Sequence, residues 1–197
     1  MNNKIAVLAS GKGSNLKAIL QAIAQGDCCA KVEVVICNKA DAVALDIAKA
    51  AHVPHVYYLN PKDYAGREAF DEACRKMIQD ADCKLIVLAG YMRILSEHFI
   101  QAFPQQIINI HPSLLPSFIG ADAVGDALRY GVKISGCTVH IVTKELDSGP
   151  ILAQSCVPVL VEDDSFTLHA RIQEKEYELY PVVIDKLIKQ GGEEKKC

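Results

Sequence analysis

A glycine-rich turn near the start of the chain has the composition of an anion-binding site. The segment Ser10-Gly11-Lys12-Gly13-Ser14-Asn15 lies between a strand-like run and a helix-like run. Glycine permits a tight backbone turn, and the free N–H groups at a helix start can receive an anion. A dinucleotide fingerprint would need a third glycine and a later acidic residue, where the chain has Leu16 and Asn38, and P-loop spacing is absent. The pattern favours a phosphate without a dinucleotide, with a simple tight turn as the alternative.

A second polar segment could stabilise negative charge on a carbonyl oxygen. Asn109-Ile110-His111-Pro112-Ser113-Leu114-Leu115-Pro116 follows a buried strand-like run, so its polar groups are expected at the carboxyl edge of a sheet, where open α/β sheets bind ligands. Asn109 and His111 alternate along an extended chain and can point to the same side. Both can donate a hydrogen bond to a developing oxyanion. The alternative is a histidine hydrogen-bonded within a loop.

A carboxylate in a later turn could serve the same chemistry. Asp147 lies in Glu145-Leu146-Asp147-Ser148-Gly149-Pro150, a composition that is ordinary for a turn. If this loop folds back over the sheet edge, Asp147 approaches His111 and favours its protonated form. The pair would then supply a general acid and a proton relay near neutral pH.

Other polar residues have ordinary structural interpretations. His52 and His55 form an H-x-x-H pair without a third ligand in reach, so we expect no metal site. His140 is expected to be a hydrogen-bonded histidine within a strand. The 8 cysteines show no C-x-x-C pair and are expected to be reduced and structural. Polar residues on a helix usually face solvent, and this is the ordinary interpretation of Arg171, Gln173 and Glu176 on the predicted last helix.

The elements that position these residues alternate between strands and helices. Strands are predicted over residues 4–9, 32–37, 54–58, 85–89 and 107–110, and helices over 16–25, 42–51, 63–80 and from a cap at Ser96 to 103. Further along we predict a helix over 122–130 ended by Gly131, strands over 134–142 and 151–161, and a helix over 165–189 that Pro181 must kink or divide. Residues 191–197 are predicted to form a frayed polar tail. The alternation predicts an α/β fold with a doubly wound, mostly parallel sheet, a C-terminal hairpin-like addition and a long C-terminal helix.

The bulk properties indicate an ordinary globular protein. The chain has 197 residues, half of them hydrophobic and 23% charged, so we expect a single domain over 1–197. Its net charge of -3 argues against nonspecific binding to nucleic acid. No apolar run is long enough to cross a membrane, and the first is too short for a signal peptide. We therefore expect a cytoplasmic protein, monomeric or homodimeric, without nucleic-acid or membrane partners.

Taken in order, the motifs resemble the glycinamide ribonucleotide formyltransferase family. The resemblance rests on Gly11 to Asn15, on Met92-Arg93-Ile94-Leu95, on Asn109 to Pro116 and on Leu146 to Pro150, and it extends from about residue 4 to residue 188. It implies a Rossmann-like formyltransferase fold. It also implies an enzyme of purine biosynthesis that transfers a formyl group from 10-formyltetrahydrofolate, as a co-substrate and without a metal, to the amine of glycinamide ribonucleotide.

The resemblance also implies a role for each matching residue. Asn109, His111 and Asp147 match the catalytic trio of the family. The ribonucleotide contacts are expected from Gly13, Ser14, Asn15, Gln173 and Glu176. The folate contacts are expected from Arg67, Met92, Arg93, Ile94, Leu95, Asn109, Thr143, Lys144, Glu145, Leu146 and Asp147. The half of the chain over about 1–100 would thus bind phosphate, and the half over about 101–190 would bind folate and carry the catalytic residues.

One segment departs from the family pattern and keeps rival functions open. Ile119 and Asp122 stand where the family often has proline and histidine, and Ile119 is more similar to the related 10-formyltetrahydrofolate hydrolases. Those hydrolases commonly have a second histidine where this chain has Pro112, and they lack the glycine-rich turn. Methionyl-tRNA formyltransferases carry a C-terminal tRNA-binding domain, for which this chain is expected to be too short. The remaining alternative is a noncatalytic folate- or nucleotide-binding module.

Overall fold

The computed structural model of the chain describes the backbone of residues 2–193 and the side chains of residues 2–191. The strands are β1 (Lys4–Ala9), β2 (Lys31–Cys37), β3 (His55–Tyr58), β4 (Leu85–Leu88), β5 (Ile107–His111), β6 (Ile134–Ile141) and β7 (Ile151–Pro158). The helices are α1 (Ser14–Gln25), α2 (Val43–Ala50), α3 (Arg67–Asp80), α4 (Glu97–Ala102), α5 (Ala123–Tyr130) and α6 (Ser165–Glu193), with a short 3-10 turn, η1 (Pro61–Asp63).

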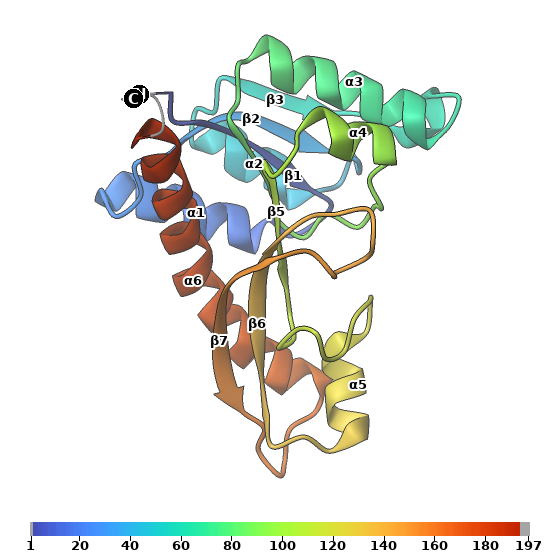
Figure 1. Cartoon of the computed structure of the whole chain (residues 1–197), viewed down its shortest axis with the longest axis vertical. Helices are drawn as coiled ribbons and strands as arrows, with labels where there is room; N and C mark the ends of the chain where they lie inside the picture. Colours follow the sequence, from blue (N-terminus) through green and yellow to red (C-terminus); the bar gives the residue numbers. More distant parts are fainter. Residues whose placement is uncertain (1, 194–197) are drawn as a thin grey trace.

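Within these described residues, the strands form one seven-stranded sheet in the order β3-β2-β1-β4-β5-β6-β7. The strands from β3 to β5 are parallel, whereas β6 pairs antiparallel with β5, and β7 antiparallel with β6. In Figure 1 the β6–β7 hairpin extends away from the parallel strands, with α5 beside its far end. The predicted fold class, including the hairpin addition and the long C-terminal helix, is therefore confirmed.

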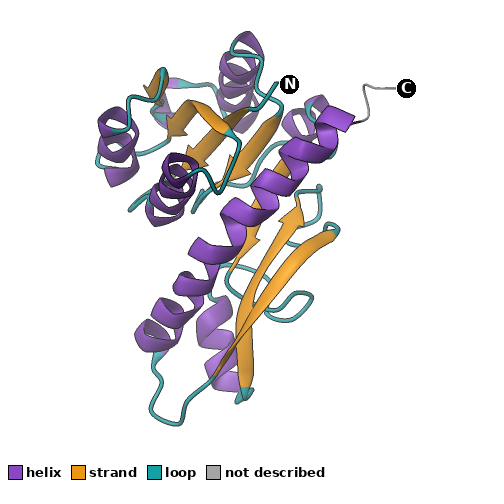
Figure 2. Cartoon of the chain, turned by 90° about the vertical axis from the view of Figure 1, so that its left-hand side faces the viewer, coloured by secondary structure: helices purple, strands orange, loops and turns teal. Residues whose placement is uncertain are grey.

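Helices cover both faces of the parallel strands because the strands are apolar on both sides. In β1, the side chains of Ile5, Val7 and Ala9 pack into a core shared with α1, α2 and α6. The alternate side chains of Ala6 and Leu8 pack into a second core, shared with α3 and α4. Fully buried parallel strands need such cover on each face. Figure 2 shows α6 lying along the hairpin and continuing past the parallel strands, so one helix joins both parts of the sheet.

The register of β4 and β5 exposes the polar end of β5. Leu88, the last residue of β4, pairs with Asn109, and β5 continues beyond it to His111. On its other side, β5 pairs with β6, which places Asn109 opposite His140 and His111 opposite Thr138. The polar segment of β5 thus projects beyond β4, between the parallel strands and the hairpin.

The helix predicted over residues 63–80 begins later than expected. It starts at Arg67, because Gly66 has a φ of 146°, which an α-helix cannot contain. Before it, Pro61–Asp63 forms a separate turn, whose backbone N–H at Lys62 donates to the Asn60 side chain. The prediction missed this break because a glycine in a helical pattern does not reveal its backbone angle.

Of the two outcomes predicted at Pro181, a kink or a division of the last helix, the division does not occur. α6 runs as one element from Ser165 to Glu193 with Pro181 inside it. Proline removes one backbone donor, but Tyr180, Val183 and Ile184 beside it are buried against the sheet and hold the helix in place. The predicted polar tail begins within this helix, and its residues 194–197 lie outside the described part of the chain.

Candidate active site

A cavity of about 650 Å³ lies at the carboxyl ends of the parallel strands. This size suits a small organic ligand. The loops after β1, β4, β5 and β6 line it, together with one face of α6. The lining includes Gly11, Lys12, Gly13, Ser14, Asn15, Met92, Arg93, Ile94, Leu95, Asn109, His111, Thr143, Lys144, Glu145, Leu146, Asp147, Gln173 and Glu176. Residues singled out from five separate parts of the sequence therefore meet in one place.

The glycine-rich turn is held tightly at the start of α1. Gly13 is the residue before the helix and has a φ of 69°, and a Cβ there would lie only 2.8 Å from the Cα of Ala44. The carbonyl of Gly11 accepts a hydrogen bond from the N–H of Ala44. The first turn of α1 contains no acidic residue. These features leave a positively polarised helix start facing the cavity, as anion binding requires.

Ser10 ties this turn to the neighbouring loops. Its hydroxyl donates to the side-chain oxygen of Asn38 at 2.6 Å and accepts from the N–H of Met92 at 2.7 Å. The ends of β1, β2 and β4 are thereby joined through one hydroxyl group. This explains the role of Asn38, which occupies the position where a dinucleotide-binding protein would have an acidic residue.

The loop after β6 folds back over the sheet edge and brings Asp147 to His111. Oδ2 of Asp147 lies 3.4 Å from Nδ1 of His111 and accepts a hydrogen bond from the N–H of Gly120 at 3.2 Å. His111 is 5% exposed. The loop needs glycine at position 149, where a Cβ would lie 1.9 Å from the carbonyl oxygen of Ile141. The proximity expected from the sequence is therefore present.

The second nitrogen of His111 faces a backbone carbonyl. Nε2 lies 2.9 Å from the oxygen of Phe118. Since both nitrogens of the ring face an oxygen acceptor, only a ring that carries hydrogen on both can donate to both. A neutral ring can donate to only one of these two oxygens.

His140 is a site residue that the sequence interpretation missed. It is 2% exposed, and its Nδ1–H donates to its neighbour's carbonyl, that of Ile141, at 2.9 Å. Burial, the largest cause, lowers the pKa of His140 and favours the neutral ring. Nε2 then accepts from Nδ2 of Asn109 at 3.3 Å and lies 3.6 Å from Oδ1 of Asp147. The expectation of a hydrogen-bonded strand histidine was correct but incomplete, because only the β5–β6 register shows that the ring orients the Asn109 amide.

The three polar residues of the last helix have different surroundings. Glu176 is 4% exposed, and its carboxylate accepts from Nδ2 of Asn15 at 2.9 Å. Burial raises the pKa of Glu176 to about 7, against the opposing effect of that hydrogen bond. Gln173 also lines the cavity. Arg171 instead forms an ion pair with Asp163 at 2.7 Å, so the solvated-face interpretation applies to Arg171 alone.

Other sequence candidates lie outside the cavity lining. Arg67, expected near the folate tail, is exposed at the start of α3 and does not line the cavity. Of the segment that departs from the family pattern, Ile119 and Asp122 are exposed and outside the lining, and Asp122 pairs with Arg129 at 2.8 Å. The neighbouring Gly120 does line the cavity.

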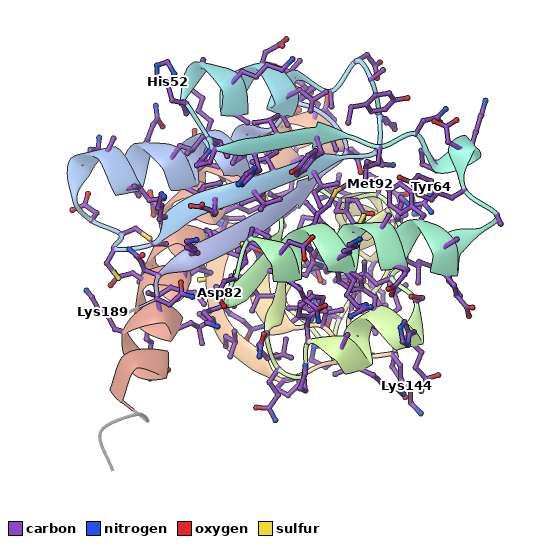
Figure 3. All side chains as sticks on the ribbon, turned by 90° about the horizontal axis from the view of Figure 1, so that it is seen from above. His52, Tyr64, Asp82, Met92, Lys144 and Lys189 are labelled. Atoms are coloured by element: carbon purple, nitrogen blue, oxygen red, sulfur yellow. The ribbon has the colours of Figure 1, made fainter. Side chains whose placement is uncertain are left out.

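Neither a cluster of metal-ligating side chains nor a helix that could span a membrane is found among the described residues. No group of three or more His, Cys, Asp or Glu side chains in residues 2–191 is arranged to hold a metal ion. His52 lies on the opposite side of the molecule from Lys144 of the cavity (Figure 3). None of the helices in the described part of the chain is long and apolar enough to span a membrane.

Comparison with known families matches residues 3–184 to the formyl transferase model. The chain belongs to the formyl transferase family. The resemblance predicted from the motifs is thus confirmed. Within formyl transferases, the chain is 42% identical to the phosphoribosylglycinamide formyltransferase of Bacillus subtilis. The 185 aligned residues cover 94% of each protein. The chain is 45% identical over 181 residues to the same enzyme of Haemophilus influenzae, covering 92% of this chain and 85% of that one.

Solved structures of formyl transferases have the same fold. Glycinamide ribonucleotide transformylase 1 from Symbiobacterium toebii superposes with a TM-score of 0.92 at 44% identity, over 95% of this chain and 88% of that protein. Phosphoribosylglycinamide formyltransferase from Bacillus halodurans gives a TM-score of 0.90 at 38% identity, over 94% of this chain and 95% of that protein. The similarity therefore includes the hairpin and α6, which complete the cavity.

Proposed function

We propose that the chain transfers the formyl group of 10-formyltetrahydrofolate to the amine of glycinamide ribonucleotide, a step of purine biosynthesis. The relatives named for this activity support the proposal. The observation that carries it is the meeting of His111 and Asp147 in the same cavity as the glycine-rich turn. A histidine–aspartate pair next to an anion-binding turn fits formyl transfer to a phosphorylated amine better than it fits ligand binding without catalysis.

The ribonucleotide would occupy the α1 end of the cavity. Its phosphate would accept hydrogen bonds from the backbone of Gly13, Ser14 and Asn15, where the helix start favours negative charge. Gln173 and Glu176 would contact the ribose and the amine. In support, Oδ1 of Asn15 is buried without a hydrogen-bond partner, so this end of the cavity offers an unused acceptor.

The folate would occupy the other end, between the loop of Met92, Arg93, Ile94 and Leu95 and the loop of Thr143, Lys144, Glu145, Leu146 and Asp147. Met92, Ile94 and Leu146 are 74%, 62% and 53% exposed. Large apolar side chains exposed together at a cavity indicate a binding surface for an apolar or aromatic group. Arg67 would meet only the distant tail of the folate.

The reaction we propose is a direct transfer. The neutral amine attacks the formyl carbon and gives a tetrahedral intermediate, whose oxyanion accepts hydrogen bonds from Asn109 and from the His111 imidazolium. To do so, His111 exchanges the Phe118 carbonyl for the substrate oxygen. Asp147 holds the ring and orients a water that moves the proton from the attacking nitrogen to the folate nitrogen, which then leaves. 10-Formyltetrahydrofolate is thus a substrate and not a resident cofactor.

The deciding assay incubates the purified protein with 10-formyltetrahydrofolate, with and without glycinamide ribonucleotide, and follows both products by mass spectrometry. We expect loss of the formyl group only when the amine is present, with equal formation of the formylated ribonucleotide. Release of formate without the amine would instead identify a hydrolase. No turnover under either condition would identify a binding module and refute the proposal.

A further inference from the structure

His169 is a titratable residue of the cavity that the proposed reaction does not use. It lies on α6, four residues before Gln173 and seven before Glu176, and all three line the cavity. Side chains at these spacings share one face of a helix. Glu176 on this face reaches Asn15 at the start of α1. His169 therefore lies two helical turns away on the face that meets the phosphate-binding end.

The surroundings of His169 hold a positive field. His169 is exposed at the cavity, where partial desolvation, followed by the charge of Lys12, lowers its pKa. Lys12 belongs to the glycine-rich turn, and Lys39 from the loop after β2 adds a second cation to the same cavity. The other charged or titratable groups that line the cavity are Tyr91, Arg93, His111, His140, Lys144, Glu145, Asp147 and Glu176. Among the described residues, Lys12 is the charged group that contributes to the lowered pKa of His169, after desolvation.

These features are arranged for an anion. The start of α1 presents backbone N–H groups with no acidic side chain in the first turn, and Lys12 and Lys39 line the same cavity. A dianion seated there would offset the charge of Lys12 and offer an acceptor to the imidazole of His169. Both changes favour the charged form of the ring.

We propose that His169 recognises the phosphate of the substrate by taking up a proton from solvent when a phosphate monoester dianion binds. The resulting imidazolium pairs with the phosphate, next to Lys12. This inference rests on the proposed function and extends it, since it names a residue that recognises the charge of the phosphate. It implies that affinity for the phosphorylated substrate falls as pH rises above neutrality.

The test measures binding of ribose 5-phosphate by titration calorimetry at pH 7 in two buffers of different ionisation enthalpy. We expect wild-type protein to take up a larger fraction of a proton than His169→Gln, in which Kd rises roughly tenfold for the loss of one charge-assisted hydrogen bond. The difference between the proteins cancels the ionisation of the ligand itself. His169→Lys should retain the affinity but lose both the proton uptake and its pH dependence.

Two controls separate this inference from the proposed function. His52→Gln removes a histidine on the other side of the molecule from the cavity loop of Lys144 (Figure 3) and should behave as wild type. Equal proton uptake and equal Kd in wild type and His169→Gln would overturn the role of His169 while leaving the phosphate site and the transferase assay intact. Failure of ribose 5-phosphate to bind any of the proteins would overturn both assignments.

Discussion

Each donor of the candidate site is oriented by a second residue. The amide of Asn109 donates to the neutral ring of His140, and the ring of His111 lies between Asp147 and the Phe118 carbonyl. A donor that is already oriented, such as the amide of Asn109, needs no rearrangement when charge develops on a substrate, which is why such groups contribute strongly to catalysis. The second N–H of Asn109 therefore has a defined direction before substrate arrives.

This arrangement predicts the effect of removing the acid or its partner. His111→Ala removes one oxyanion donor, and Asp147→Asn removes the charge that faces the ring. Each should lower kcat by ~100–1000-fold. Affinity for glycinamide ribonucleotide should change little, because neither residue belongs to the phosphate-binding end. Steady-state kinetics and a binding titration provide the two measurements, and wild-type turnover in either variant would exclude the assignment.

At the scale of elements, the strands were the easiest part to predict. Largely apolar runs such as residues 32–37 are typical of strands buried on both faces, and β2 is indeed buried along this run, including Glu33. Turn geometry was harder to predict. Gly66 interrupts a helical pattern, and the spacing of the apolar residues does not indicate this break. The importance of His140 depends on the pairing of β5 with β6, a tertiary relationship that spacing along the chain does not contain.

The turn between β1 and α1 offers a prediction at this scale. Gly13→Ala places a methyl group against Ala44 and forces a side chain onto a φ of 69°. We expect loss of ribonucleotide binding together with a lower melting temperature. Gly26→Ala is the matched control, because Gly26 also has a positive φ, 85°, but has nothing within 4 Å of an added Cβ. That variant should cost about 1–2 kcal/mol of stability and leave binding unchanged.

The Tyr180 hydroxyl links α6 to two neighbouring strands of the sheet. The Tyr180 hydroxyl lies 3.0 Å from the carbonyl oxygen of Leu88 and 3.1 Å from that of Ile108, so it spans β4 and β5. Tyr180→Phe leaves these buried acceptors without that donor and should lower the free energy of unfolding by about 1–3 kcal/mol. Urea denaturation measures the change. Tyr130→Phe, at a side chain that is 80% exposed, should have almost no effect and serves as the control.

At the scale of the whole molecule, the buried carboxyl group of Glu176 in the candidate site lowers the free energy of unfolding. Glu176 has its pKa raised by burial from 4.5 to about 7. The unfolded chain therefore releases this proton at lower pH than the folded chain, and stability falls as pH rises from about 4.5 to about 7. Below this window the carboxyl is protonated in both states and the penalty vanishes. Above it, the penalty is constant.

The corresponding variant should be more stable than wild type. Glu176→Gln removes the penalty, so its gain in unfolding free energy should be absent near pH 4 and reach up to about 3 kcal/mol at pH 8, from the size of the pKa shift. Chemical denaturation at both pH values tests this. The same variant should bind glycinamide ribonucleotide more weakly. A gain of equal size at both pH values would show that the carboxylate is not the cause.

The sequence predicted most residues that meet in the cavity, although they come from distant segments. Their family resemblance supplied this grouping, because no local pattern joins Gly13 to Glu176. Arg67, assigned in the same way, does not line the cavity, since α3 begins outside it. His169 gave no signal on its own, although its helical spacing from Gln173 and Glu176 would have placed it on the same face.

Two sets of side chains on α6 face different environments, which makes this helix suitable for redesign. Leu168, Ile172 and Tyr180 point into the sheet, whereas His169, Gln173 and Glu176 point into the cavity. Because adjacent positions face different environments, the second set can be exchanged for side chains that recognise another phosphorylated amine while the first set keeps the helix in its place. An engineered change of acceptor specificity therefore has a short, rigid and well-defined set of starting positions.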